Sequence, residues 1–452
     1  MNSRKQSYYG FGGYLAAESQ TIRPESINGV IEAVKTFAKE TILTHGTGNS
    51  YGDAALNENG VVLLTSRLNR ILSFDEETGI LRAEAGITLN DILTVSLPRG
   101  WSLSVVPGYS NNTLGGCVAF DIHSKNHWKE GSFSRHLAGL RIVLADGSLQ
   151  ECSRDLEPDL FWATVAGMGL TGIIIEVELR LRRIKIPLFK VHSIPVYNMG
   201  EIFTHFDNFS SKSEFAVAWI DLLNPGAFGR GVFITANYAT SNILNGKAIN
   251  EKPFSSNKSL SKFSLKHMAP FYNKFTNRLF NIAYFYKNAK TKHPFLLNLR
   301  PFLFPWDNIP HWNQLYGRKG FIEYQYVIPT VDAPDAFNSI LDLIRARQHD
   351  FPVYFAAIKR MGPSEAPLSY PIDGYSMLLD YPMKEGLFEF LDEMDKIVLN
   401  YKGRVYLAKD GRVSSKMFHK MYPKLDQWLK VKNAFDPDKL FSSNMSRRLL
   451  IT

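Results

Sequence analysis

Residues 45–53 read His-Gly-Thr-Gly-Asn-Ser-Tyr-Gly-Asp, and this stretch decides the fold of the N-terminal part of the chain. It follows a short apolar segment at 41–44 that is typical of a strand. Glycine tolerates positive φ and leaves successive backbone amides free to converge on phosphate oxygens, which suits an anionic ligand. The spacing is G-x-G-x-x-x-G, and a polar turn follows in place of a helix, so a Rossmann fold is disfavoured. A Walker loop is excluded because no Gly-Lys-Ser/Thr follows, while a plain surface turn stays open.

A second loop of small residues strengthens the case for a ligand. Pro107 and Gly108, followed by Thr-Leu-Gly-Gly at 113–116, again offer free amides before an apolar segment. A third glycine cluster, at 167, 169 and 172, leads into an alternating strand at 173–184 whose backbone could meet an adenine edge. Two such loops in one unit predict a single extended anionic ligand that lies across both.

The periodicity around these loops indicates an α+β unit of roughly 190 residues. We expect helices and strands here at 25–40, 61–65, 71–86, 140–152 and 159–167. Later segments have the character of strands at 215–240, 318–330, 351–360 and 374–382, and residues 414–432 have the pattern of one amphipathic helix. This order predicts a first domain, a second β-rich domain, and a C-terminal segment that returns to the first.

The composition restricts the class of protein. Hydrophobic residues make up 45% and charged residues 21% of 452 residues, as in ordinary globular proteins. Cys117 and Cys152 are too few for a disulfide framework, and neither a signal peptide nor an apolar run of about 18 residues is present, so we expect a cytoplasmic protein. The net charge of +9 fits a phosphorylated substrate, a membrane surface or solubility alone. Without a nucleic-acid-binding motif, no nucleic-acid partner is expected.

Longer motifs run through nearly the whole chain in order. They are GTGNSYGD at 46–53, TLGG at 113–116, DIHSKNH at 121–127, LFWAT at 160–164, YQYVIP at 324–329, KRMGP at 359–363 and YLAKD at 406–410. Together they resemble the vanillyl-alcohol oxidase family, whose members carry a PCMH-type FAD-binding domain, and within it the subfamily that oxidises decaprenylphosphoryl ribose. The resemblance implies an α+β fold with an FAD-binding domain at 1–187, a substrate domain on an antiparallel sheet at 188–403, and a C-terminal segment at 404–452.

The same resemblance implies the cofactor site. The FAD contacts fall on Gly46, Thr47, Gly48, Asn49, Ser50, Tyr51, Gly52, Asp53, Ala54, Ala55, Gly108, Thr113, Leu114, Gly115, Gly116, Phe120, Asp121, Ile122, His123, Ile174 and Tyr406. Many family members attach FAD covalently through a histidine in the first loop. The matching position here is Asn49, and His45 lies four residues upstream. We therefore expect non-covalent FAD.

Oxidation of a secondary alcohol needs a group that accepts the hydroxyl proton and positive charge that stabilises the alkoxide. Lys125, Lys359 and Lys409 lie in family motifs, and at one site they would lower one another's pKa values. One could then act as a base while the others hold a phosphate. The resemblance places Lys409 nearest the flavin, as base or alkoxide stabiliser, with His123 against the flavin and Gln325 in the substrate site. Outside the family, each lysine would be a solvated surface charge.

Two further observations limit these assignments. His123 and His127 have the i, i+4 spacing of a zinc site, but serine replaces the glutamate of a metalloprotease helix and no third ligand is near, so no metal is expected. The active-site cysteine of the family corresponds to Leu378, a nearby asparagine to Ser376, and a substrate-site tyrosine to Leu303. These changes leave flavin chemistry intact and keep the sugar and its lipid open.

The resemblance implies oxidation of C2 of a polyprenyl-phosphoryl ribose to the keto sugar in arabinose-donor or cell-envelope glycan synthesis, with a short-chain reductase as possible partner. A free alditol, aldonolactone or O-antigen sugar is the alternative substrate, and a non-catalytic basic binding protein is the alternative outside enzymes. The segment around 241–300 is rich in lysine, arginine and aromatic residues. It could dock the protein on an anionic bilayer, at the inner face of the cell membrane, or act as a lid.

Overall fold

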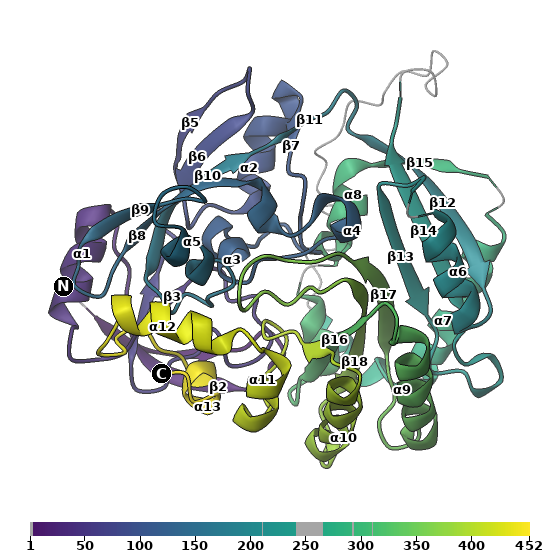
Figure 1. The fold of residues 1–452 in the computed structure, drawn as a ribbon. Coiled ribbons are helices and arrows are strands. Elements are labelled where there is room, and N and C mark those ends of the chain that lie inside the picture. The colour runs from purple at the N-terminus through teal and green to yellow at the C-terminus, as the bar shows by residue number, and fades with distance from the viewer. Residues whose placement is uncertain (1–2, 210, 241–264, 292, 310) are drawn as a thin grey trace.

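The computed structural model describes residues 3–209, 211–240, 265–291, 293–309 and 311–452 (Figure 1). Helices accompany sheets whose strand pairs are mostly antiparallel, which fits the predicted α+β class. The N-terminal part of the described chain forms two larger sheets and a two-stranded one, and the rest forms one large sheet. No helix in the described ranges is long and apolar enough to cross a bilayer.

The N-terminal part contains a four-stranded and a five-stranded sheet. The first has the order β1 (Arg4–Tyr9), β2 (Ala16–Ile22), β4 (Val61–Leu64), β3 (Ile42–His45). The second has the order β5 (Ile71–Phe74), β6 (Ile80–Glu84), β10 (Ile173–Arg180), β8 (Leu137–Val143), β9 (Leu149–Cys152). The short strands β7 (Trp101–Ser102) and β11 (Arg182–Arg183) pair separately. The helices of this part are α1 (Ile27–Thr36), α2 (Leu89–Ser96), α3 (Leu114–Ala119), α4 (His127–Glu130) and α5 (Pro158–Thr164).

The predicted local elements of this part are present for the expected reasons. Ser26 accepts a hydrogen bond from the Gly29 amide and so caps α1, which buries Val30, Ala33 and Val34 against the sheet. Both predicted hairpins form, as β5 with β6 and as β8 with β9. These elements place the glycine loop directly after β3.

The remaining chain forms an eight-stranded sheet. Its order is β15 (Phe295–Asn298), β12 (Leu188–Val196), β14 (Gly231–Tyr238), β13 (Phe215–Ile220), β17 (Phe355–Met361), β18 (Gly374–Pro382), β16 (Phe321–Pro329), β19 (Arg404–Val405). All its pairings are antiparallel. Its helices are α6 (Met199–Phe209), α7 (Lys274–Ala289), α8 (Leu299–Leu303), α9 (Ala333–Arg347) and α10 (Leu387–Asn400), joined by the 3-10 segments η5 (Leu265–Phe271), η6 (Pro305–Asn308) and η7 (Trp312–Tyr316).

The C-terminal segment packs against the N-terminal part. The Ile42 amide donates to the Leu440 carbonyl at 2.7 Å, and the Trp428 indole donates to the Ala163 carbonyl at 2.8 Å. Figure 1 shows two helices of this segment, α12 (Leu425–Phe435) and α13 (Asn444–Arg448), beside the N-terminal sheets. The domain boundaries predicted at 187 and 403 stay a prediction.

One predicted element is wrong. Residues 414–432 form two helices, α11 (Ser415–Met421) and α12 (Leu425–Phe435), and α13 (Asn444–Arg448) follows. Pro423 separates the first two, because proline cannot donate the helical hydrogen bond and restricts the residue before it, Tyr422, to extended backbone. Of the basic, aromatic segment predicted at 241–300, residues 241–264 and 292 lie outside the described residues.

Candidate active site

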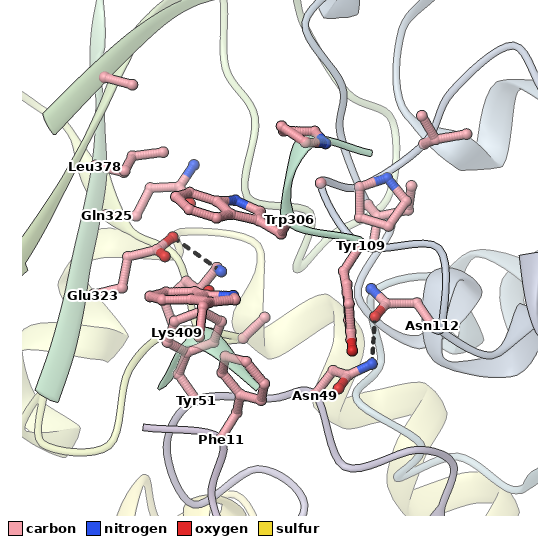
Figure 2. Close-up of a pocket in the computed structure, with 18 of the residues that line it drawn as sticks. Phe11, Asn49, Tyr51, Tyr109, Asn112, Trp306, Glu323, Gln325, Leu378 and Lys409 are labelled. Carbon is pink, nitrogen blue, oxygen red and sulfur yellow. Dashed lines mark hydrogen bonds and ion pairs between the residues drawn. The ribbon is translucent and has the colours of Figure 1, made fainter. Parts of the chain in front are cut away.

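A cavity of about 950 Å³ lies between the glycine loops and one face of the eight-stranded sheet (Figure 2). Its wall includes the first loop, the second loop, the segment after α3, and side chains from β12, β13, β14, β16, β17 and β18. One end of the cavity is therefore built from backbone-rich loops and the other from side chains of a sheet.

The first glycine loop reaches the cavity because β3 ends at His45. The amides of Thr47, Gly48, Asn49 and Ser50 have no acceptor within the described chain, and all four residues line the cavity. The Thr47 hydroxyl donates to the Asn111 carbonyl at 2.8 Å, and the side-chain nitrogen Nδ2 of Asn49 donates to Asn112 Oδ1 at 2.6 Å. These bonds tie the two loops together and leave the amides available to an anion, as a diphosphate requires.

The second loop differs from the prediction. The Leu114 amide donates to the Ile87 carbonyl at 2.8 Å, Gly115 to the Ala85 carbonyl at 2.7 Å, and Gly116 to the Thr113 hydroxyl at 3.3 Å. These amides are therefore not free for a ligand, since the loop is a helix cap packed on the segment before α2. Glycine is required at Gly46 for a different reason, because a Cβ there would lie 2.4 Å from Thr113 Oγ1.

Most residues predicted to contact FAD line this one cavity. They are Gly46, Thr47, Gly48, Asn49, Ser50, Tyr51, Ala54, Ala55, Gly108, Thr113, Gly115, Gly116, Phe120, Ile122, His123, Ile174 and Tyr406. Four predicted residues do not: Gly52, Asp53, Leu114 and Asp121. Gly52 packs on the Asp410 carbonyl, Asp53 accepts hydrogen bonds from Arg448, Leu114 is in the core, and Asp121 accepts from Ser364 and Ser369. In the structure these four support the loops.

The lysines predicted to be catalytic and the predicted substrate-site residues also line the cavity, from the eight-stranded sheet, the segment after α3 and the segment after β19. Lys125, Gln325, Lys359, Leu378 and Lys409 are all part of its wall. Gln325 stands directly opposite Leu378 in the pairing of β16 with β18. Figure 2 shows these two side chains from neighbouring strands, with Lys409 beside Tyr51.

Two acidic residues of the site were missed by sequence reasoning. Glu323 and Asp380 are buried, line the cavity and stand directly opposite each other on β16 and β18. Each lies two residues from a predicted site residue, Gln325 or Leu378, so the period of two puts them on the same face of the sheet. A charged residue inside an otherwise apolar strand was the signal that could have found them.

The three lysines meet at the cavity in different electrostatic states. Burial, with the charge of Lys359 next, lowers the pKa of Lys125 to about 7. Burial also lowers the pKa of Lys359 to about 8; Glu323 opposes this shift and Lys409 adds to it. The prediction that the lysines lower one another's pKa values is confirmed for these two. Lys409 has a counterion, because its Nζ lies 2.9 Å from Glu323 Oε1 and 3.4 Å from the centroid of the Tyr51 ring.

His123 is held by the substrate-site amide. Its Nε2 lies 2.9 Å from Gln325 Nε2, which also donates to Ser376 Oγ at 3.1 Å. An amide nitrogen can only donate, so His123 Nε2 accepts and Nδ1 carries the proton. Burial, followed by the charge of Lys359, places the pKa of His123 well below its usual value, which keeps the ring neutral. Its Nδ1 is buried without a partner in the described chain.

His127 is engaged by the protein itself. Its Nε2 lies 2.9 Å from Ser132 Oγ, and its Nδ1 accepts the Gly362 amide at 2.9 Å. Both ring nitrogens are therefore occupied, which removes His127 as a ligand for a metal at His123.

Asp380 is the second buried group with an orphaned atom. Tyr316 donates to its Oδ2 at 3.2 Å, while Oδ1 has no partner in the described residues. Burial and then the facing Glu323 raise the pKa of Asp380 well above its usual value. The unpaired atoms of Asp380 and His123 belong to cavity-lining side chains, as expected of a wall that a bound molecule completes.

The positions that depart from the family pattern divide in two groups. Leu378 and Leu303 line the cavity. At its wall, leucine therefore replaces the cysteine and the tyrosine of the family. Ser376 does not line it and bonds Gln325 and the Tyr370 hydroxyl, the latter at 2.7 Å. Ser376 therefore positions Gln325 by a hydrogen bond from outside the cavity wall.

Comparison with known proteins agrees with this geometry. A family described as "FAD binding domain" matches residues 19–153, the part that contains the glycine loops, and one described as "D-arabinono-1,4-lactone oxidase" matches residues 315–449. Decaprenylphosphoryl-beta-D-ribose oxidase of Mycolicibacterium smegmatis is 35% identical over 96% of this chain and 95% of the relative. This chain belongs to the vanillyl-alcohol oxidase (PCMH-type) family of flavoenzymes. More distant is L-gulono-1,4-lactone dehydrogenase of Mycobacterium tuberculosis, 22% identical over 97% of each chain.

Family membership makes FAD the cofactor and FAD-dependent oxidoreduction of a sugar or lactone the activity. The residues present fit the cofactor, because the free amides after Gly46 suit its diphosphate and His123 and Asp380 present unpaired polar atoms in the wall. The reading of the chain as a non-catalytic binding protein is therefore wrong.

Proposed function

We propose that this enzyme oxidises the C2 hydroxyl of a polyprenyl-phosphoryl ribose to the 2-keto sugar. The observation that supports this proposal most is that the cavity lined by the three lysines also has an apolar part. Val217, Trp219 and Ile234 from the sheet, with Leu297 and Phe302, line it. A free sugar has no apolar surface to bury there, whereas a polyprenyl chain attached to a sugar phosphate does.

The proposed chemistry uses the lysines in three roles. Neutral Lys125 accepts the hydroxyl proton, since its pKa of about 7 leaves roughly half of the amine free at pH 7. Lys409, which is paired with Glu323, stabilises the negative charge that forms on the sugar oxygen. Lys359 holds the phosphate. Bound FAD supplies the acceptor for the hydride. Sequence reasoning left Lys409 as base or stabiliser, and its ion pair favours stabiliser.

The proposal implies that FAD lies on residues 1–187 and the sugar on residues 188–403, with the C-terminal segment carrying Lys409 between them. We also propose that FAD is bound without a covalent bond. The side chain of Asn49 is not a nucleophile, and its Nδ2 donates a hydrogen bond to Asn112. Acid precipitation should then leave a colourless pellet and yellow supernatant; a yellow pellet would contradict this. The keto product needs a reductase if arabinose is to form, which makes a short-chain reductase the expected partner.

A second candidate is oxidation of a free lactone sugar. The match of residues 315–449 to the lactone oxidase family favours it, and that range contains Glu323, Gln325, Lys359, Leu378 and Lys409. The two candidates differ in whether the apolar part of the cavity is used.

The deciding experiment is anaerobic bleaching of the bound flavin. The purified enzyme is mixed with a short-chain polyprenyl-phosphoryl ribose, with ribose, and with L-gulono-1,4-lactone, and the flavin absorbance is followed. We expect bleaching by the lipid-linked sugar at concentrations where the free sugars have no effect. Bleaching by the lactone alone would replace the proposal by the second candidate, and bleaching by none would reject both.

A further inference from the structure

Exposed apolar side chains are concentrated in one short stretch. Of the fifteen large apolar side chains exposed in the described chain, nine belong to residues 265–309: Met268, Phe271, Phe275, Leu279, Phe280, Tyr286, Phe295, Leu296 and Ile309. We call these nine the apolar rim. Monomeric soluble proteins rarely gather exposed apolar groups in this way unless the surface binds something.

Helix α7, which carries much of the apolar rim, has inverted polarity. Asn277 and Asn281 are buried on its inner face, while Phe275 and Leu279 are 68% and 51% exposed on its outer face. Tyr286 lies on the same outer face, since positions 275, 279 and 286 fall within about 40° of one another at 3.6 residues per turn. A surface helix of a soluble protein normally has the opposite arrangement.

Hydrogen bonds hold α7 in this orientation. The Asn281 amide donates to buried Asp221 at 2.9 Å, and Arg278 Nε donates to Asn224 Oδ1 at 2.8 Å. Asp221 is itself paired with Arg230, whose guanidinium lies 4.6 Å from the Phe285 ring centroid on the inner face of α7. Rotation of the helix to bury its phenylalanines would break these buried bonds, so the apolar face is fixed outward.

The apolar rim surrounds an opening of the active-site cavity. Met268, Phe271, Phe280, Phe295 and Ile309 are exposed and also line the cavity. Side chains that meet both solvent and the cavity stand at its mouth. Whatever covers the apolar rim is therefore placed where the substrate enters.

The charge around the apolar rim is predominantly positive. Residues 265–309 contain seven lysines and arginines and one acidic residue, Asp307, which accepts a hydrogen bond from the Ser110 amide at 2.9 Å. Lys287 on α7 and Lys290, which follows its last residue, are exposed beside the outer face of the helix. Aromatic and aliphatic side chains bordered by cations complement the acyl boundary and the anionic headgroups of a bilayer. A neutral protein partner would not require this excess of positive charge.

We infer that the apolar rim docks this enzyme on an anionic bilayer, so that the cavity mouth opens onto the lipid. The occupant is the membrane surface itself. This docking does not depend on which sugar is oxidised, because the binding residues Phe275, Leu279, Lys287 and Lys290 are not part of the cavity wall.

The test is sedimentation of the full-length, FAD-loaded enzyme with vesicles, without any substrate. Wild-type protein should pellet with vesicles of phosphatidylcholine plus phosphatidylglycerol, less with phosphatidylcholine alone, and less at high salt. F275S/L279S should weaken the partition coefficient at least tenfold, since two buried apolar side chains are lost. K287Q/K290Q should weaken it about fivefold per lysine on anionic vesicles only.

Matched controls use exposed residues of the N-terminal and C-terminal segments, away from α7 in Figure 1: L72S/L156S and K39Q/K430Q. They should bind as wild type does, and flavin content reports that every variant is folded. No pelleting at low salt would overturn the inference, and so would equal losses in the controls. Concentration-dependent dimerisation that the F275S/L279S variant abolishes, without vesicle binding, would assign the apolar rim to a second copy instead. None of these outcomes bears on flavin bleaching, so the redox proposal is judged separately.

Discussion

Arg448 joins the cofactor loop to the segment of Lys409, and its loss gives a sharp test of the site. Its Nε and Nη2 donate to the two oxygens of Asp53 at 2.8 Å each, and Nη2 also donates to Asp410 Oδ2 at 3.0 Å. Asp53 follows the first glycine loop and Asp410 follows Lys409. The side chains of Arg448, Asp53 and Asp410 are 22%, 8% and 6% exposed.

Arg448→Met should lower the free energy of unfolding by about 3 kcal/mol. Removing one partner of a buried ion pair costs about 3–5 kcal/mol, and we take the lower end because Arg448 is partly exposed. If the destabilisation by Arg448→Met is confined to the first glycine loop, the same amount of about 3 kcal/mol is lost from FAD binding. This weakens FAD binding by about 150-fold, at 1.36 kcal/mol per factor of ten. Denaturant unfolding of the apo-protein and fluorescence titration with FAD measure the two quantities.

The pH dependence of Arg448→Met has a defined sign. Burial raises the pKa of Asp53, and Arg448 opposes that rise. Without the guanidinium, the folded-state pKa rises further above that of the unfolded chain, so the folded state binds more protons. The free energy of unfolding of the variant should then fall as pH rises from about 4 through the folded-state pKa of Asp53. Acidification from pH 7 to pH 5 should therefore reduce the difference in stability between the variant and the wild type.

The matched control is Arg67→Met. Arg67 pairs with Glu25 at 2.8 Å, but both side chains are about half or more exposed, at 49% and 67%. Such a pair contributes about 0–1 kcal/mol. If Arg448→Met loses less than 1 kcal/mol and binds FAD normally, or if Arg67→Met loses as much, the reasoning about the Arg448 cluster is wrong.

Three further predictions concern the chemistry. The second-order rate constant for flavin reduction should fall about tenfold per pH unit below pH 7, because Lys125 has a pKa of about 7. If the K125M variant shows the same fall below pH 7, Lys125 is not the base. Lys409→Met should slow flavin reduction about 10²–10³-fold with little change in FAD content, as stopped-flow absorbance would measure; an unchanged rate would remove its role as stabiliser. Electrophiles aimed at a cavity thiol should label L378C and not wild type by mass spectrometry, because the wild-type thiols, Cys117 and Cys152, are buried with raised pKa values; an adduct on wild type would contradict this.

The sequence by itself determined the cofactor loop and three lysines that line the cavity. A glycine cluster after a strand has a local meaning, because backbone freedom depends on residue type, and the family motifs carried Lys125, Lys359 and Lys409 to one site. The break at Pro423 was predicted wrongly as part of one helix, although proline acts only on its own helix and on the residue before it, so the signal was local. These features need no knowledge of what packs against them.

Only the tertiary structure decided which groups act on one another. The amides at 114–116 are taken by carbonyls of residues 85 and 87 and by the Thr113 hydroxyl, and that competition cannot be read from the loop alone. Glu323 meets Asp380 and Lys409 because strands distant in sequence lie in register, and burial there raises the pKa of Asp380. The inverted face of α7 depends in the same way on Asp221, an acceptor sixty residues away from Asn281. Charge state and orientation are properties of the surroundings, and long-range packing supplies them.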